Sequence, residues 1–181
     1  DCLSARVQSC YPDALIVHRL DMQTSGLLAM ARGIAAQRAI NLAFEKRRVH
    51  KRYQAVVDGV LAQADEAAWG VIDLPLELDW PNRPKHIVDH VNGRPSVTRW
   101  RVLSPEPELD GTRLELEPVT GRSHQLRVHL QAIGLPILGD DLYASPDAIA
   151  RANRLLLHAC ELHLPHPVSG EPMTFSSLPP F

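Results

Sequence analysis

Three polar segments of the sequence carry residue types that can do chemistry. The first, His18–Gly26 (HRLDMQTSG), places Asp21 two residues after Arg19, in a polar loop that leads into an apolar stretch. A neighbouring guanidinium favours the ionised form of a carboxyl group, and an ionised carboxylate can act as a nucleophile. The same segment also fits a plain turn in which Asp21 is a cap and Thr24 and Ser25 bond the local backbone. The segment by itself leaves both interpretations open.

The second segment, Glu45–Tyr53, concentrates positive charge where a predicted helix ends and a predicted strand begins. Cations near a helix C-terminus compensate the helix dipole on a solvated face. The same cluster could instead bind phosphates, with Tyr53 as a platform on which a base stacks. The spacing does not separate the two interpretations. The basic residues are Lys46, Arg47, Arg48, Lys51 and Arg52.

The third segment, Thr120–His129, places Arg122 just before a predicted helix. Free N–H groups at a helix N-terminus favour anions, and the planar guanidinium fork suits a carboxylate or phosphate. Spacings of three and four residues put Arg122, Leu126 and His129 near one face of that helix. We interpret His124 and His129 as packing histidines whose ring nitrogens are hydrogen-bonded within the fold.

The elements that must position these segments alternate between short strands and a few helices. Proline and glycine turns are scattered through the chain, and most strands are adjacent in sequence, which favours an α+β fold with a mixed, largely antiparallel sheet flanked by helices and loops. Ser123 is a plausible cap for the second helix, and Gly134 with Pro136 ends it. Apolar and polar periodicity predicts helices at Ile34–Arg48 and Ser123–Ile133, and strands at Leu27–Ala31, Tyr53–Val60, Val71–Leu78, Ser96–Leu103, Thr112–Pro118, Leu155–Leu157 and Glu161–Leu164, before a proline-rich tail.

Composition excludes several classes of protein. The 181 residues are 45% hydrophobic and 22% charged, as in soluble globular proteins, and no apolar run approaches the roughly 18 residues that span a bilayer. The net charge of −2 argues against binding nucleic acid by bulk positive charge but allows a local basic face. The three cysteines form no CxxC pair, which indicates a reducing cytoplasm. The nine histidines form no HExxH motif, so we expect no metal site.

Taken together, the motifs resemble one family. HRLDMQTSG, KRYQAVVDG and TGRSHQLRVHLQAIGLPILGD are similar to motifs of the RluA family of pseudouridine synthases, and DLPLELDWPNRPKH, YASP and LLLHA continue the resemblance from His18 to Phe175. DWPNRPK is similar to the dual-specificity branch, whose substrates are rRNA and tRNA. The family's upstream strand and lysine–proline motif have no counterpart, so we expect a single catalytic domain, residues 1–181, that is truncated at its N-terminus.

The resemblance implies a reaction and three catalytic residues. Pseudouridine synthases break the uracil N1–C1′ bond, turn the ring and join C5 to C1′, without redox change or loss of a group, so no metal or organic cofactor is expected. Asp21 is implied as the carboxylate, either nucleophile at C1′ or base at C2′. Arg122 is implied as its ion-pair partner, and Tyr53 as the ring that packs on the uracil and assists loss of the C5 proton.

The resemblance also implies how RNA is held. The target base must leave its stack, which costs a few kcal/mol; we expect Arg19 to fill the vacated space and Leu126 to form an apolar wall. Stem-loops of large-subunit (23S) rRNA and tRNA are the expected partners, bound by a monomer. About six to ten phosphate contacts neutralise enough RNA backbone for binding, so a local patch suffices. The predicted contacts are Lys46, Arg47, Arg48, Lys51, Arg52, Arg83, Lys85 and Arg94.

Two alternatives belong to other classes. In a non-catalytic RNA-binding module the basic patch would dock RNA and Asp21 would be structural; release of the C5 hydrogen from labelled uridine separates this from an enzyme. A glycosidase needs two acids about 5 to 9 Å apart. Near Asp21 the sequence offers arginines instead of a second acid, so this alternative ranks last.

Overall fold

The computed structural model describes residues 2–61 and 68–181. Its helices are α1 (Leu3–Cys10), α2 (Gly33–Glu45), α3 (Gln125–Ala132) and α4 (Pro146–Ala150), with 3-10 turns at Trp80–Asn82 and Pro107–Leu109. Its strands are β1 (Ala14–Ile16), β2 (Ser25–Gly26), β3 (Met30–Arg32), β4 (His50–Asp58), β5 (Gly70–Asp73), β6 (Leu76–Leu78), β7 (His86–Val88), β8 (Val97–Glu106), β9 (Gly111–Pro118), β10 (Leu157–Pro165) and β11 (Pro172–Ser176).

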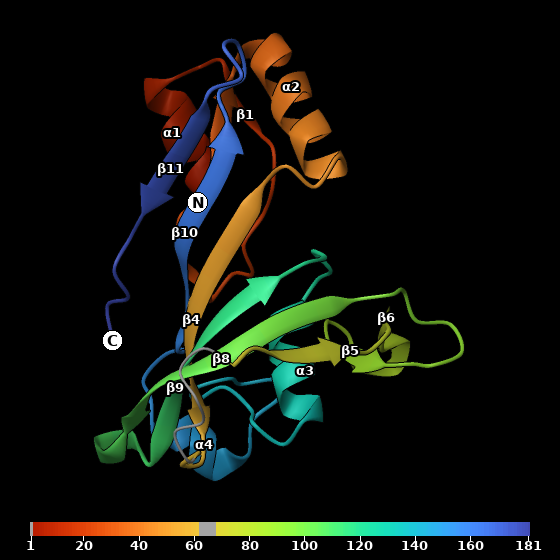
Figure 1. The fold of residues 1–181 in the computed structure, drawn as a ribbon, viewed down its shortest axis with the longest axis vertical. Coiled ribbons are helices and arrows are strands. Elements are labelled where there is room, and N and C mark those ends of the chain that lie inside the picture. Colours follow the sequence, from red (N-terminus) through yellow and green to blue (C-terminus); the bar gives the residue numbers. More distant parts are fainter. Residues whose placement is uncertain (1, 62–67) are drawn as a thin grey trace.

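The main sheet has the strand order β11-β10-β4-β9-β8-β5, and all of these neighbours are antiparallel. The short β2 pairs in parallel with β10, which makes the sheet mixed. Figure 1 shows β4 and β10 as long strands that connect an upper group, with α1 and α2, to a lower group that carries α3 and α4. The predicted α+β fold with a largely antiparallel sheet is therefore confirmed.

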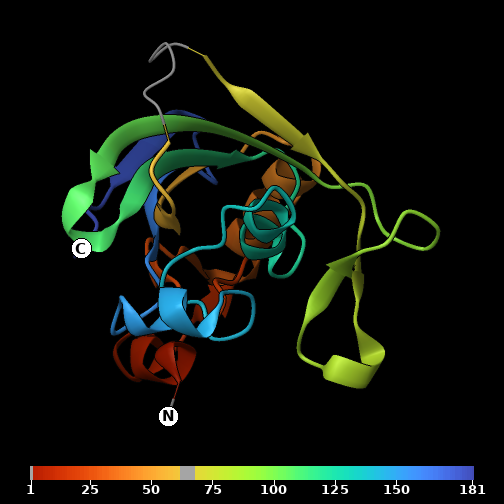
Figure 2. The same cartoon turned by 90° about the horizontal axis from the view of Figure 1, so that it is seen from below.

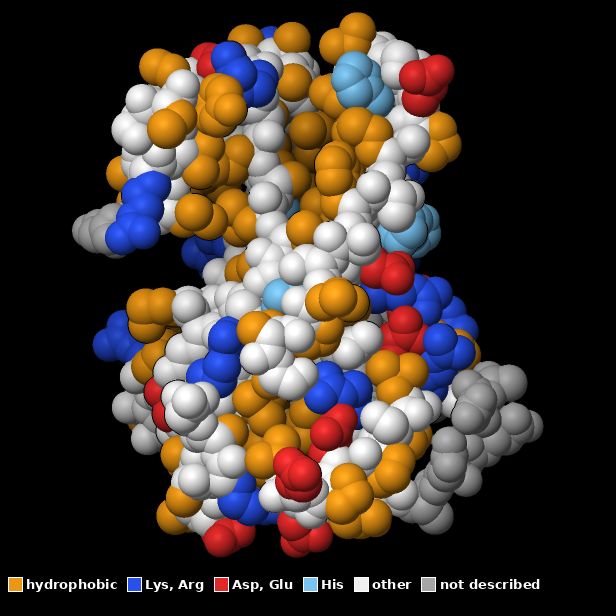
Figure 3. Space-filling model, turned by 90° about the vertical axis from the view of Figure 1, so that its left-hand side faces the viewer, with side chains coloured by type: hydrophobic (Ala, Val, Ile, Leu, Met, Phe, Trp, Pro, Cys, Tyr) orange, Lys and Arg blue, Asp and Glu red, His pale blue; other side chains and the backbone are white. Residues whose placement is uncertain are grey.

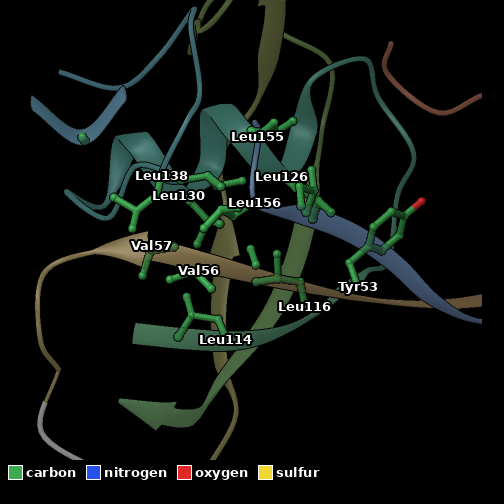
Figure 4. Packing of buried hydrophobic residues seen from close by; sticks show 14 of the residues in the cluster. Tyr53, Val56, Val57, Leu114, Leu116, Leu126, Leu130, Leu138, Leu155 and Leu156 are labelled. Carbon is green, nitrogen blue, oxygen red and sulfur yellow. The ribbon is translucent and has the colours of Figure 1, made fainter. Parts of the chain in front are cut away.

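The sheet is curved, and its concave side holds the core. Figure 2 shows β8 and β9 as an arc with α3 and α4 on one side of it. Tyr53 and Ala55 of β4 stand opposite Leu116 and Leu114 of β9 in the strand register, so their side chains share a face of the sheet. These four residues are buried and belong to the same hydrophobic cluster as Leu126 and Leu130 of α3, with Tyr53 at its edge (Figure 4). The core thus fixes where Tyr53 stands.

The helix predicted at Ile34–Arg48 ends earlier, at Glu45. Arg47 adopts a left-handed backbone conformation (φ 54°), and the Arg48 N–H donates to the Ala43 carbonyl, which closes the helix. Ile40 of α2 packs with Ala31 and with Leu162 of β10 in a second, smaller core cluster. α2 therefore covers the upper half of the sheet.

The strand predicted at Val71–Leu78 is instead two strands. Pro75 has no N–H to donate to a ladder, and the chain turns away from the main sheet at this point. β5 pairs with β8, whereas β6 pairs with β7 and forms a separate hairpin. Both strands are partly buried, so apolar and polar residues alternate on either side of Pro75. The alternation therefore predicted one continuous strand.

Two predictions near the C-terminal end of the sequence also change. Leu157 and the predicted strand Glu161–Leu164 lie in a single strand, β10, which has a register shift between Ala159 and Glu161, whereas Leu155 and Leu156 precede it. The proline-rich tail contains β11, paired with β10 from Glu161↔Ser176 to Pro165↔Pro172. Pro172 is tolerated there because β11 is an edge strand.

Candidate active site

The three chemistry-bearing segments meet at one pocket. Its volume is about 100 Å³, and it opens between the loop before β2, the first half of β4 and the loop from β9 to α3. All three residues predicted as catalytic lie on its wall, together with the predicted Arg19, Lys51 and Leu126. The lining residues are Arg19, Leu20, Asp21, Thr24, Lys51, Tyr53, Pro118, Thr120, Gly121, Arg122, Gln125, Leu126 and Leu157.

The loop that carries Asp21 is anchored to β10. The Thr24 N–H donates to the Asp21 carbonyl (2.9 Å), and the Ser25 hydroxyl lies 2.8 Å from Nδ1 of His158 on β10. Gly26 has a φ of 108°, and a Cβ there would lie 2.6 Å from the Ala159 backbone nitrogen. Only glycine fits such a close approach at this φ. β2 therefore sits tightly on β10 and fixes the end of the loop.

Tyr53 reaches the pocket from the other side of β10. Ala159 pairs with Gly26 on one edge of β10 and with Tyr53 of β4 on the other, so a single residue separates the loop anchor from the tyrosine. Figure 4 shows the Tyr53 hydroxyl pointing away from the leucine core. Burial, and next the negative charge of Asp21, raises the pKa of Tyr53, so it is a neutral phenol at physiological pH.

The loop that carries Arg122 is held by Gln125, which is 3% exposed. The Gln125 Oε1 accepts hydrogen bonds from the Thr120 hydroxyl (2.7 Å) and the Arg122 N–H (3.0 Å), while its Nε2 donates to the Val97 carbonyl (2.9 Å). The predicted Ser123 cap is wrong: α3 begins at Gln125 after a left-handed His124, with no side chain capping it. The amide of Gln125 shapes this loop instead.

Asp21 and Arg122 share the pocket but do not touch. Among residues 2–61 and 68–181, no ion pair within 4.0 Å involves either side chain, so the expected direct pair is not formed. The positively charged side chains of the pocket, Arg19, Lys51 and Arg122, are instead distributed around its wall. Arg19 and Arg122 are exposed, which leaves both guanidiniums accessible to a ligand.

A buried ionic network lies behind the pocket. Arg127 of α3 binds both carboxylate oxygens of Asp140 and lies 3.4 Å from Asp141, whose Oδ2 accepts a hydrogen bond from Gln23 of the Asp21 loop (2.9 Å). Burial lowers the pKa of Arg127, but the hydrogen bond and charge of Asp140, with a smaller contribution from the charge of Asp21, raise it overall. Apart from Asp21, none of these residues is among the catalytic or binding residues predicted from the sequence motifs. A signal was present, because charged residues in the apolar run of α3 require buried partners.

The predicted packing histidines are bonded within the fold. Nδ1 of His124 lies 2.7 Å from the Tyr143 hydroxyl, which also accepts the His86 N–H. His129 is fully buried between the Thr98 hydroxyl (2.9 Å) and the Leu74 carbonyl (3.0 Å), and burial lowers its pKa. Leu126 and His129 lie three residues apart in α3, whereas Arg122 precedes the helix; of the three, His129 does not line the pocket.

The predicted basic contacts are distributed over several surfaces. Lys51 lines the pocket, while Lys46, Arg47 and Arg48 are exposed at the end of α2. Arg83 lies over the Trp80 ring (4.7 Å) beside Lys85 in the loop between β6 and β7, and Arg94 bridges Leu76 of β6. None of Arg83, Lys85 and Arg94 is among the lining residues of the pocket.

Arg52 lies on the opposite face of the sheet from Tyr53, because successive strand residues alternate. It binds Glu115 (2.8 Å) and lies 3.9 Å from Glu161 and 5.5 Å from the Trp69 ring. Figure 3 shows basic and acidic side chains next to each other just below the narrow middle of the molecule. The structure therefore separates Arg52 from the pocket and gives its charge partners within the protein.

Nowhere in residues 2–61 or 68–181 do three or more His, Cys, Asp or Glu side chains gather as metal ligands would. No helix in the described part of the chain has the length and apolar character needed to cross a bilayer.

Known proteins are similar to this chain in sequence and fold. Residues 5–132 match the family model described as RNA pseudouridylate synthase. The dual-specificity RNA pseudouridine synthase RluA of Yersinia pestis is 50% identical over 97% of this chain and 82% of its own length, and that of Escherichia coli K12 is 49% identical over 98% and 78%. Human RNA pseudouridylate synthase domain containing 1 has a TM-score of 0.83 at 29% identity, covering 99% of this chain and 74% of the human chain.

These matches identify the chain as an enzyme that isomerises a base in RNA. The chain belongs to the RluA family of RNA pseudouridine synthases. The family resemblance and the prediction of an RNA-modifying isomerase are confirmed, and a non-catalytic RNA-binding module is set aside.

Proposed function

We propose that the chain converts uridines in stem-loops of large-subunit (23S) rRNA and of tRNA to pseudouridine at the pocket around Asp21. The observation that carries this proposal is the convergence of Asp21, Tyr53 and Arg122 on one pocket wall. The names of the Yersinia and Escherichia relatives, which specify dual specificity, support two kinds of RNA substrate. We further propose that the chain acts in the cytoplasm as a monomer.

Asp21 is the proposed catalytic carboxylate. It acts at the sugar of the flipped-out nucleotide, either by attacking C1′ or by removing the C2′ proton, and the N1–C1′ bond breaks. Uracil then turns, C5 bonds to C1′, the proton on C5 is lost and N1 gains one, so the product is an isomer of the substrate. The half-buried position of Asp21 supports this role, because a carboxylate partly removed from water reacts with less solvent to displace.

Tyr53 and Leu126 are the proposed walls for the uracil ring. Both are 7% exposed and stand side by side at the end of the core, so the ring would stack against a preformed apolar surface (Figure 4). A neutral phenol next to the ring can accept or relay the C5 proton only through its oxygen lone pairs, since the raised pKa of Tyr53 keeps the hydroxyl protonated.

Arg122 and Arg19 are the proposed cationic contacts. Arg122 approaches the phosphate or the developing charge on the departing uracil, and it is drawn toward Asp21 when RNA fills the pocket. Arg19, exposed at the pocket mouth, fills the space that the flipped base leaves. The proposed contacts to the RNA backbone are Lys46, Arg47, Arg48, Lys51, Arg83 and Lys85. Arg52 is a weaker candidate, because its guanidinium already binds Glu115.

The test of Asp21 uses Asp21→Asn with Asp147→Asn as matched control. Asp147 lies on α4 and its side chain is 84% exposed, so its loss should leave turnover unchanged. We expect Asp21→Asn to fold and bind RNA as the wild type does while forming no pseudouridine in 23S rRNA or tRNA transcripts. Measurable turnover by Asp21→Asn would refute the assignment. Tyr53→Phe should bind RNA and lose most activity; an unchanged rate removes its hydroxyl from the chemistry.

A further inference from the structure

A second hollow adjoins the active-site pocket. It measures about 340 Å³, within the range of ligand sites, and it shares Lys51, Pro118, Thr120 and Gly121 with the pocket. Its remaining walls come from the end of α2, the start of β4 and the end of β9. A ligand that fills the pocket therefore lies next to this hollow, which we call the side groove.

Lys51 stands between the two spaces. A Cβ placed on Gly121 would lie 3.6 Å from its Nζ, so the ammonium rests against a residue without a side chain. Burial lowers the pKa of Lys51, and across residues 2–61 and 68–181 no carboxylate comes within 4.0 Å of its Nζ. A desolvated ammonium without an anion is costly. The missing negative charge is expected on whatever enters the groove.

Arg47 lines the side groove, and its backbone adopts a left-handed conformation that is unfavourable for a residue with a side chain. It is the residue that ends α2 with φ 54°, a position that glycine usually takes. Its N–H donates to the Phe44 carbonyl (3.0 Å), so the backbone is fixed and the exposed side chain is directed from a defined point. No ion pair within 4.0 Å holds Arg47 in the described residues. The carboxylate in the groove, Glu117, lies 3.6 Å from Arg99.

We propose that the side groove binds the nucleotide next to the target uridine, with its phosphodiester between Lys51 and Arg47 and its base against Phe44. The ring of Phe44 is half-buried and packs against His18, so it presents a fixed face to a base. Base stacking on an aromatic ring is tolerant of sequence, which suits an enzyme that accepts different RNAs. This inference rests on the proposed function, since the strand that reaches the pocket is the one that continues into the groove.

The first experiment measures kinetics and salt dependence with Arg47→Gly, Lys51→Met and the control Arg38→Gln, which removes one charge from an exposed position of α2 outside the groove. We expect Arg47→Gly to raise KM about tenfold with little change in kcat, and to lower the slope of log binding constant against log salt by about one. Arg47→Gly should also raise the melting temperature, because glycine relieves the positive φ. Asp110→Gly, at φ 46° far from the groove, should raise the melting temperature alone.

The second experiment is a cycle of protein and RNA changes scored by RNA binding. In a synthetic stem-loop, a neutral methylphosphonate replaces the phosphate on either side of the target uridine. For the wild type, one of the two modified RNAs should bind about tenfold more weakly than unmodified RNA. For Arg47→Gly and for Lys51→Met, that modified RNA and unmodified RNA should bind with the same affinity. The inference is overturned if neither modified RNA binds the wild type more weakly than unmodified RNA. It is also overturned if the modification weakens binding to the variants by the same factor as binding to the wild type.

The two proposals fail in different ways. A wild-type protein that forms no pseudouridine in rRNA or tRNA transcripts contradicts the proposed function, whatever the binding cycle shows. A wild-type protein that is active, with Arg47→Gly and Lys51→Met indistinguishable from Arg38→Gln in KM, contradicts the side groove alone. Because Arg47→Gly is expected to be more stable than the wild type, this variant alone still tests the side groove if Lys51→Met does not fold.

Discussion

The guanidinium of Arg127 holds both carboxylate oxygens of Asp140, with Nε–Oδ2 and Nη2–Oδ1 distances of 2.8 and 2.6 Å, and neither side chain is more than 4% exposed. The Oδ1 of Asp140 also accepts the N–H groups of Leu142 and Tyr143. The pair joins α3, which borders the pocket, to the segment whose Asp141 binds Gln23. It therefore connects the Arg122 side of the pocket to the Asp21 side.

Removal of one partner from this pair should destabilise the protein strongly. Arg127→Met leaves the Asp140 carboxylate buried without its cation, and we expect the free energy of unfolding to fall by about 3–5 kcal/mol. Arg32→Met is the matched control, because the Arg32–Asp13 pair is exposed (61% and 47%) and such pairs contribute about 0–1 kcal/mol. Urea denaturation of both variants measures the difference; equal losses would contradict the role of the buried pair.

Gln125 should act as a positioning residue for Arg122. In Gln125→Leu the Arg122 N–H and the Thr120 hydroxyl lose their acceptor, so the loop can shift. We expect kcat to fall about 10- to 100-fold with a smaller change in KM, and the free energy of unfolding to fall by about 1–3 kcal/mol. Gln131→Leu, an exposed glutamine on the same helix, should leave both constants unchanged. A change in KM alone would assign Gln125 to RNA binding instead.

Gly26→Ala should disturb the anchor of the Asp21 loop. The added Cβ meets two penalties, a positive φ of 108° and the backbone of Ala159 at 2.6 Å. We expect a loss of roughly 3 kcal/mol in unfolding free energy and a large loss of kcat. Gly134→Ala isolates the first penalty, because its φ is 79° with open space around it, and should cost about 1 kcal/mol without affecting turnover. Equal stabilities of the two variants would show that β2 can move away from β10.

His18 should make the protein sensitive to mild acid. Burial, with a further contribution from the charge of Lys51, lowers the pKa of His18 to about 4, and its Nε2 accepts the Ala29 N–H. A folded-state pKa below the unfolded value means that the contribution to stability is complete above about pH 6.5 and is lost as the pH falls toward 4. Because the ring is not fully buried, we expect about 1 kcal/mol between pH 7 and pH 5.

His18→Gln provides the comparison for this pH dependence. Its side-chain carbonyl can accept the same Ala29 N–H but does not titrate in this range. The difference in unfolding free energy between pH 7 and pH 5 should be smaller for His18→Gln than for the wild type. The same pH dependence in both proteins would remove His18 as the cause.

The strands of the central sheet could be predicted because their signal is local. Alternation in Val97–Leu103 and Thr112–Pro118 reflects one buried and one solvated face, and β8 and β9 cover these residues. The strand break at Pro75 and the edge strand β11 were missed because they depend on which neighbour each segment pairs with. α2 ends at Glu45, earlier than the predicted Arg48, because Arg47 adopts a left-handed backbone conformation that glycine usually takes.

The sequence by itself determined the family and the residue types of the site, because Asp21, Tyr53 and Arg122 lie in short motifs whose chemistry is readable without a fold. Only the tertiary structure decided that Ala159 of β10 stands between Gly26 and Tyr53, that Arg52 faces Glu115, and that the Arg127–Asp140 pair backs the pocket. The physical reason is that strand pairing and buried ion pairs join segments far apart in the chain, where periodicity and propensity carry no information.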